Sequence, residues 1–162
     1  MPTAEQFRAY QAMYDYFNAV LFLGSLSPVL LNFSRAGRAY GFFAPERWES
    51  ADARTHEISL NPHHLLTRPA IETTSTLVHE MVHLWQWEQG KTSRRGYHNQ
   101  EWAEKMQAVG LMPSDTGLPG GRLTGQRMTH YIIDAGPFSL AFAEMPSEHL
   151  LPWQALPDPQ TA

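Results

Sequence analysis

The stretch Thr76-Leu77-Val78-His79-Glu80-Met81-Val82-His83-Leu84-Trp85 decides how this chain is interpreted. It holds the pattern His-Glu-x-x-His within a run that has the apolar spacing of a helix. Residues four apart on a helix lie on one face, about 6 Å apart along its axis, so His79 and His83 can both direct an imidazole nitrogen at one metal ion. Glu80 is placed to take a proton from water bound to that metal. The pattern predicts a zinc site that activates water.

The helix that carries this motif is expected over residues 70–89. Apolar residues cover much of its surface, which is typical of a buried helix. Buried polar groups need partners, because an unpaired one is costly. A metal ion would satisfy His79, Glu80 and His83 together. The alternative is a buried helix whose two histidines are satisfied by hydrogen bonds alone.

A catalytic zinc takes three protein ligands and keeps one position for water. The compact pattern His-Glu-x-x-His-x-x-Gly-x-x-His is excluded, because the chain has Gln86 and Gln89 where that pattern needs Gly and His. The third ligand is therefore expected later in the chain. Its position favours His98, at the start of the next expected helix. Glu101 and Glu104 remain alternatives, and Glu101 could instead orient an imidazole.

The rest of the sequence indicates an α+β fold in a single domain. An amphipathic helix is expected over residues 4–23, where aromatic and aliphatic residues recur at steps of three and four. Three short strands follow, the first two as a hairpin, and they predict a small, mostly antiparallel sheet packed on the central motif helix. If the last strand lies at an edge, it could align an extended peptide by strand addition. The strands are expected over residues 29–33, 39–43 and 57–60, with a polar loop at 44–55.

The C-terminal half is expected to contain a helix, a loop, a hairpin and a tail. The helix covers residues 98–109, and a Pro- and Gly-rich connection follows at 112–126. Residues 127–142 hold two short apolar runs around Asp-Ala-Gly-Pro, which is typical of a β-hairpin. Residues 146–162 carry four prolines and predict an extended tail. The domain is thus expected over residues 1–145.

Composition limits the function classes. A chain of 162 residues with 43% hydrophobic residues suits one folded domain, and its net charge of -4 gives no general attraction to nucleic acid or anionic membranes. It has no cysteine, which excludes disulfides, a Cys-based zinc ribbon and thiol catalysis. The N-terminal residues do not form a signal peptide pattern, and the most apolar stretch is too interrupted to span a bilayer. We expect a soluble, cytoplasmic protein.

Four stretches of the sequence resemble the SprT-like zinc metallopeptidase family, which includes the Spartan-type proteases. Phe17–Leu26 is similar to the end of the family's first helix, and Glu57–Pro62 resembles the strand before its active-site helix. His79–His83 matches the core motif, with Met81 included. Gly96–Met106 resembles the segment in which a glycine and the third zinc histidine precede a helix. The resemblance covers roughly residues 10–112.

The resemblance implies a zincin-like (minigluzincin-type) domain that hydrolyses peptide bonds with a zinc-activated water. It implies one general base and three zinc ligands: Glu80, His79, His83 and His98. The family usually places glycine directly before the third histidine, whereas Tyr97 intervenes here. Many relatives add a Cys-based zinc ribbon or basic DNA-binding modules. This chain resembles a minimal version without the ribbon.

Two hypotheses about function follow. The first is a zinc-dependent peptidase that acts on proteins or peptides, with DNA-associated proteins as one class of substrate. The second is a DNA-associated binding module whose zinc is structural. Its support is the basic run 91–95, in which Lys91, Arg94 and Arg95 could contact phosphates weakly and with strong salt dependence. The alternative for this run is a solvated basic loop on an acidic protein.

Peptide hydrolysis also needs a hydrogen-bond donor for the oxyanion of the tetrahedral intermediate. The candidates from the sequence are Tyr97, His130 and Tyr131. Their spacing does not select one of them, and for each the alternative is a purely structural role without a part in catalysis.

Overall fold

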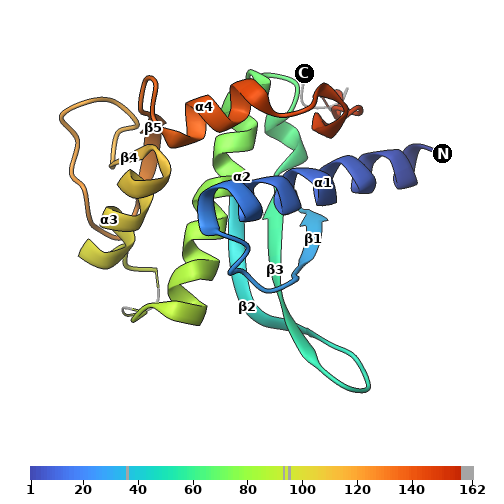
Figure 1. The fold of residues 1–162 in the computed structure, drawn as a ribbon, viewed down its shortest axis with the longest axis horizontal. Helices are drawn as coiled ribbons and strands as arrows, with labels where there is room; N and C mark the ends of the chain where they lie inside the picture. Colours follow the sequence, from blue (N-terminus) through green and yellow to red (C-terminus); the bar gives the residue numbers. More distant parts are fainter. Residues whose placement is uncertain (36, 93, 95, 158–162) are drawn as a thin grey trace.

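The apolar run around the His-Glu-x-x-His motif forms helix α2, Ala70–Gln89, in the middle of the molecule (Figure 1). The computed structural model describes residues 1–35, 37–92, 94 and 96–157. Side chains on several faces of α2 are buried, including Leu77, Val78 and Met81. A helix buried in this way forms the centre of a core instead of covering one side of it. The motif therefore lies inside the protein, as predicted.

The described residues form an α+β fold of four α-helices and two small sheets. This confirms the predicted α+β class. Among the described residues, no helix combines the length and apolar character needed to cross a bilayer. The other helices are α1, Pro2–Phe22, α3, Gln100–Val109, and α4, Pro137–Glu144. The strands are β1, Leu30–Phe33, β2, Gly41–Glu49, β3, Arg54–Leu60, β4, Leu111–Ser114, and β5, Thr129–Ile132.

The first sheet has the order β1-β3-β2, with β1 parallel and β2 antiparallel to β3. The expected hairpin of residues 29–33 and 39–43 is wrong. Leu31 pairs with Ile58 on β3, and Asn61 after β3 donates to the carbonyl of Ala39 at 3.1 Å. These contacts tie the segment after β1 to the end of β3. Strand β3 is central and not at an edge, so the condition for strand addition to it is not met.

Strands β2 and β3 are longer than predicted and form a ribbon that projects from the body of the molecule (Figure 1). The polar segment 44–55 is expected to be a loop because it lacks alternating apolar residues. In the structure its outer residues are exposed, and the register between β2 and β3 shifts between Ala44 and Trp48. A bulged ribbon that leaves the core has no buried face, so it has no apolar period to detect.

Helix α1 packs its aromatic side chains into the core. Tyr10, Tyr14 and Phe17 are buried, as the helical spacing predicted, and the Tyr10 hydroxyl donates to the Ile58 carbonyl of β3 at 3.3 Å. The Phe17 ring stacks on Phe138 of α4 at a centroid distance of 5.5 Å. This helix therefore joins the sheet to the C-terminal part of the chain.

The hairpin expected over residues 127–142 is wrong. Strand β5 pairs with β4, and the second apolar run forms helix α4. In Phe-Ser-Leu-Ala-Phe the apolar residues alternate, but Phe138 and Phe142 are also four apart and share a helical face. Pro137 at the first turn favours the helix, and burial of Phe138 selects it.

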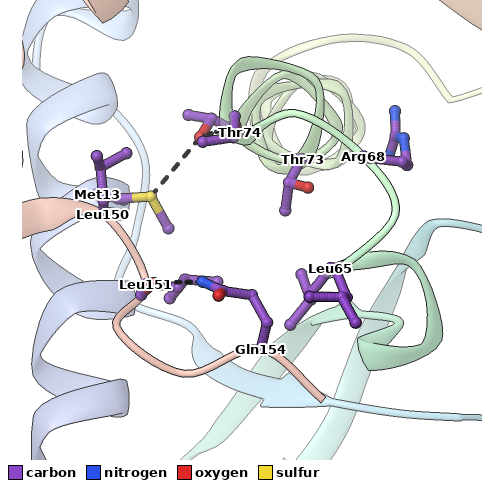
Figure 2. Close-up of a pocket in the computed structure, with 10 residues that line it drawn as sticks. Met13, Leu65, Arg68, Thr73, Thr74, Leu150, Leu151 and Gln154 are labelled. Atoms are coloured by element: carbon purple, nitrogen blue, oxygen red, sulfur yellow. Dashed lines mark hydrogen bonds between the residues drawn. The ribbon is translucent and has the colours of Figure 1, made fainter. Parts of the chain in front are cut away.

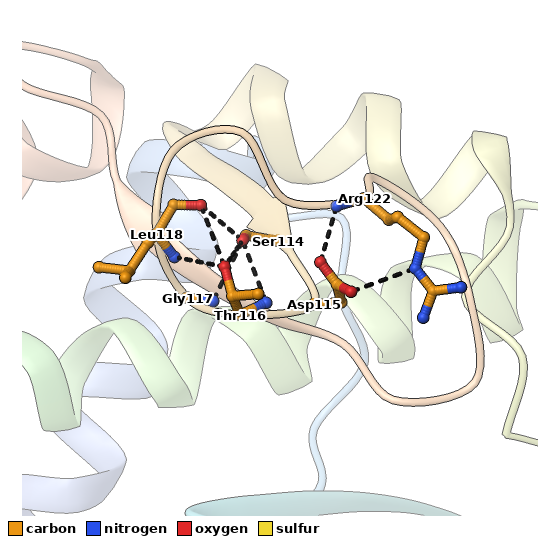
Figure 3. A network of polar contacts seen from close by, with 6 residues as sticks. All are labelled: Ser114, Asp115, Thr116, Gly117, Leu118 and Arg122. Atoms are coloured by element: carbon orange, nitrogen blue, oxygen red, sulfur yellow. Dashed lines mark hydrogen bonds and ion pairs between the residues drawn. The ribbon is translucent and has the colours of Figure 1, made fainter.

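The Pro- and Gly-rich connection between β4 and β5 begins as a compact turn held by its own polar groups (Figure 3). The Ser114 hydroxyl donates to the Leu118 carbonyl at 2.7 Å and accepts from the Gly117 amide at 3.1 Å. The Asp115 carboxylate accepts from the backbone and side chain of Arg122 at 2.7 and 3.1 Å. The turn fixes the position from which the chain continues to residue 125.

The C-terminal segment returns along α1. Gln6 exchanges two hydrogen bonds with the backbone of Trp153, at 2.8 and 3.0 Å. The boundary at residue 145 stays a prediction. This segment also closes one side of a pocket of about 290 Å³ whose lining includes Met13, Thr74 and Leu151 (Figure 2). No carboxylate or histidine is among the described residues that line it.

Candidate metal centre

Three histidines converge beside α2. His79 and His83 lie one turn apart on this helix, and His98 precedes α3. Each offers one nitrogen, and the three nitrogens lie within 4.8 Å of one another. Zinc–nitrogen bonds of about 2.0–2.1 Å hold tetrahedral ligand atoms roughly 3.3 Å apart. Small side-chain rotations would therefore bring all three nitrogens onto one ion.

A polar brace brings His98 back to α2. The Glu101 carboxylate accepts from the Lys91 amide at 2.6 Å and from the Gln86 side chain at 3.0 Å. Gln86 also donates to Asn99, which caps α3 by accepting from the Trp102 amide. A Cβ at position 90 would overlap the Glu101 carboxylate, so a larger residue than Gly90 would displace that carboxylate. The brace sets the α2–α3 turn that places His98.

The two alternative third ligands have other roles in the structure. Neither Glu101 nor Glu104 belongs to the group of described residues whose ligand atoms converge. Glu101 belongs to the brace, and Glu104 is exposed and accepts from Gln100 at 3.3 Å. The geometry therefore favours His98 among the three candidates. The Glu101 carboxylate is bonded to Gln86 and Lys91, which favours bracing over orienting an imidazole.

Two of the three imidazoles have their Nδ1 atoms engaged. His79 Nδ1 lies 2.9 Å from His130 Nδ1, and His98 Nδ1 lies 3.0 Å from the carbonyl oxygen of Gly125. Nε2 is therefore the nitrogen left for a metal on both rings. Ligand histidines in metalloproteins usually use their second nitrogen for a hydrogen bond of this kind. These donors fit a bound metal ion.

Burial keeps the histidines uncharged. Desolvation lowers the pKa of His79 well below its ordinary value, with smaller effects from the neighbouring histidines. Burial, helped by His98, lowers the pKa of His83 to about 3, and burial also lowers the pKa of His98. Neutral imidazole is the form that binds metals. The site therefore presents three neutral nitrogen donors at neutral pH.

Trp102 forms an apolar wall of the centre. Its fully buried ring lies 5.3 Å from the His79 ring, 5.5 Å from the His83 ring and 4.6 Å from the His98 ring, measured between centroids. Within the described part of the chain, its indole nitrogen has no hydrogen-bond partner. The wall excludes water from one side of the three rings. Nothing in the sequence pattern indicates that Trp102 contacts all three histidines.

Glu80 follows His79 in α2 and faces a cavity of about 250 Å³. His79, Thr76 and Gly41 line the same cavity. Glu80 is 7% exposed, and burial raises the pKa of its carboxyl to about 8. The cavity thus joins the histidine cluster to a carboxyl group that can exchange a proton near neutral pH.

The expected oxyanion donors lie in different places. His130 lines the cavity, but both of its ring nitrogens are engaged, one with His79 and one with the Ser75 hydroxyl at 2.8 Å. Tyr97 lies under the Arg94 guanidinium at 4.4 Å, and Tyr131 lies on β5. Neither tyrosine is among the residues that line the cavity.

A comparison with family models identifies the chain's relatives. The model of the SprT-like family matches residues 10–122, which is more than half of the chain. The chain belongs to the SprT-like family. Membership confirms the resemblance found in the sequence and indicates a metallopeptidase-like domain. No curated protein matches the sequence of this SprT-like chain.

In this SprT-like domain the family match contains the three histidines and Glu80 but ends before β5. Gly125 and His130, which contact two of the imidazoles, therefore lie beyond the matched stretch. Sequence reasoning named His130 for another role and gave no signal for Gly125. Both contacts depend on the course of residues 123–132.

Metal-free Glu80→Gln in this SprT-like domain should be more stable than the parent above pH 5. Burial raises the pKa of Glu80 from 4.5 to about 8, so the folded state binds the extra proton between these values and the parent loses stability as pH rises through them. Gln has no proton to lose. With EDTA present, urea unfolding should show the stability advantage of Glu80→Gln over the parent growing by about 3–4 kcal/mol from pH 5 to pH 8.

The histidines titrate in both proteins, so their effects cancel in this difference. The exposed variant Glu104→Gln is the matched control and should show no such growth. A constant difference between Glu80→Gln and the parent across this range would contradict a buried, proton-holding Glu80.

Proposed function

We propose that this SprT-like domain is a zinc-dependent metallopeptidase with a zincin-like site. The observation that carries the proposal is the convergence of three histidine nitrogens within 4.8 Å beside the buried Glu80. His79, His83 and His98 would hold the ion. Three neutral nitrogen donors with an open position suit a catalytic zinc. Family membership supports the same chemistry.

A zinc ion in this site would lower the pKa of water and polarise a scissile carbonyl group. Glu80 supplies the proton transfers: its carboxylate accepts a proton from the attacking water and delivers it to the leaving amine. Its location in the cavity beside His79 supports this role. Burial raises its pKa to about 8 without a metal, and a cation nearby favours the ionised form, which is the base.

The substrate is an extended peptide in this proposal. Strand β2 lies at an edge of the described sheet, and Gly41 at its start lines the cavity with Glu80. The outer edge of β2 therefore starts at the site. Its backbone groups can pair with an extended peptide by strand addition. The expectation of strand addition thus moves from β3 to β2.

Replacing Glu80 with Gln should remove peptidase activity while the metal stays bound. The amide side chain of this variant accepts no proton, so casein cleavage should fall by a factor of about 10²–10⁴. Zinc content, measured by elemental analysis, should equal that of the parent. The exposed Glu104→Gln serves as the control and should cleave normally. Full activity of Glu80→Gln would refute the mechanism.

Replacing His98 with Ala should empty the metal site. The purified parent should carry about one zinc per chain, and His98→Ala should retain little, because two ligands cannot replace the three that a catalytic site needs. Glu101→Ala keeps all three imidazoles and should retain zinc, although the brace is weakened. If Glu101→Ala lost zinc and His98→Ala kept it, the ligand assignment would be wrong.

As a second candidate function, we propose weak DNA binding by the α2–α3 turn, either on its own or together with proteolysis. Lys91 and Arg94 are exposed in this turn, close in sequence to His98, and Arg94 lies over the Tyr97 ring. Exposed cations contact phosphates, and an aromatic ring can stack on a base. Arg95, the third expected contact, lies outside the described residues.

Fluorescence anisotropy with single-stranded DNA tests this candidate. The double variant Lys91→Ala/Arg94→Ala should bind more weakly, and its log–log salt dependence should be shallower by about 1.4, which corresponds to two phosphate contacts on a single strand. Arg8→Ala/Arg54→Ala, which removes two exposed cations elsewhere, is the control. Equal binding by both variants would contradict the candidate. DNA binding by a zinc-loaded chain that never cleaves casein would favour the binding module over the peptidase.

A further inference from the structure

A chain of hydrogen bonds runs from His79 back to the start of α2. His79 Nδ1 lies 2.9 Å from His130 Nδ1, and His130 Nε2 lies 2.8 Å from the Ser75 hydroxyl. The Ser75 hydroxyl in turn donates to the Glu72 carbonyl oxygen at 2.7 Å. Ser75 is fully buried and His130 is 9% exposed, so water does not compete readily for these groups.

The last acceptor fixes the direction of every bond in this chain. A carbonyl oxygen only accepts, so the single proton of the Ser75 hydroxyl is used on Glu72. The hydroxyl must then accept from His130, whose proton lies on Nε2. A neutral His130 therefore has an unprotonated Nδ1, which accepts from His79 Nδ1. His79 Nε2 is left without a proton and with its lone pair free.

We propose that His130 is a positioning residue, which with Ser75 holds His79 in the orientation and tautomer that bind a metal ion. The inference rests on the metal site of the proposed function but assigns a role to a residue outside the ligand set. His130 reaches His79 from β5, beyond the stretch that the family model matches. The contact joins residues 51 positions apart in the sequence.

The same segment orients a second ligand. Gly125 forms a backbone bridge with His98, with hydrogen bonds of 2.8 and 3.0 Å, and its carbonyl also accepts from His98 Nδ1. This carbonyl too can only accept, so His98 Nε2 is the free nitrogen. Residues 125–130 thus contact the Nδ1 atoms of His79 and His98. This one segment therefore orients two of the three proposed ligands.

This role is incompatible with His130 as an oxyanion donor. Its Nε2 proton is directed at Ser75, and its Nδ1 accepts from His79. To donate to a substrate, the ring would have to give up one of these contacts while it is buried, which leaves a polar group unpaired. The contacts favour the positioning role.

Imidazole NMR on the metal-free protein tests the tautomers directly, without reliance on zinc or on proteolysis. Long-range proton–nitrogen spectra of the parent should show His79 protonated at Nδ1 and His130 protonated at Nε2. In His130→Leu, which keeps a side chain of similar size but no acceptor, His79 should shift towards the Nε2-protonated form that free imidazole prefers. A parent His79 protonated at Nε2 would overturn the inference.

Metal affinity provides the second readout. In a competition with a chelator, His130→Leu should bind Zn²⁺ about 10–100-fold more weakly than the parent. His130→Asn places an amide oxygen near the position of Nδ1 and should restore most of the lost affinity. The visible spectrum of the Co²⁺-loaded protein should change in His130→Leu and return towards that of the parent in His130→Asn. The exposed His63→Leu is the matched control and should change neither readout.

The outcomes separate this inference from the proposed function. Unchanged zinc affinity in His130→Leu overturns the positioning role. Equal losses of zinc affinity in His130→Leu and His130→Asn also overturn the positioning role, because the His130 ring would then act only through packing. Circular dichroism and thermal unfolding identify a variant that fails to fold, and the NMR result on the parent then decides alone. A parent that binds no zinc would refute the proposed function, while the tautomer measurement would still stand.

Discussion

The structure depends on keeping two imidazoles and a carboxyl group inside an apolar helix environment. His79 and Glu80 are each 7% exposed, in a helix whose neighbouring side chains Leu77, Val78 and Met81 are fully buried. Burial disfavours charge on all of these groups, and it moves the pKa of the histidines down and that of Glu80 up. Such a helix is stable only where the surrounding elements supply partners. For His79 that partner is His130 of β5.

The features that shape the site come from different parts of the chain. The Gln86–Glu101 brace shapes the turn that presents His98, residues 125–130 contact the outer nitrogens of two imidazoles, and Trp102 walls the rings from one side. The small sheet contributes the cavity wall at Gly41. The brace and the contacts of residues 125–130 limit where the imidazole nitrogens can lie. The site is held by several independent contacts around one buried helix.

Local signals in the sequence allowed part of the fold and site to be predicted. The bounds of α2 follow from apolar spacing, and the candidate ligands His79 and His83 follow from a motif with fixed helical geometry. The family assignment was confirmed by a family model that matches residues 10–122. The parallel pairing of β1 with β3 has no local signal, because it joins residues about 27 apart and leaves the pattern of each strand unchanged.

Other predictions of secondary structure were wrong because the same residue pattern fits both a strand and a helix. Phe138 and Phe142 fit a strand by alternation and a helix by their spacing of four, and packing against Phe17 selects the helix. The projecting β2–β3 ribbon lacks a buried face and so lacks an apolar period. The role of His130 was hidden for a different reason: a lone histidine on a short strand has no motif, and only the folded chain shows that it contacts His79.

The long separations between contacting residues have a consequence for how the protein matures. His98 meets Gly125 across 27 positions, and His79 meets His130 across 51. Contacts between distant residues form late, because loop closure must precede them. The helix with its two motif histidines can form early, but the site is complete only when the chain through β5 has docked. A chain still emerging from the ribosome would thus lack the Nδ1 contacts of His79 and His98 until the segment through β5 is available.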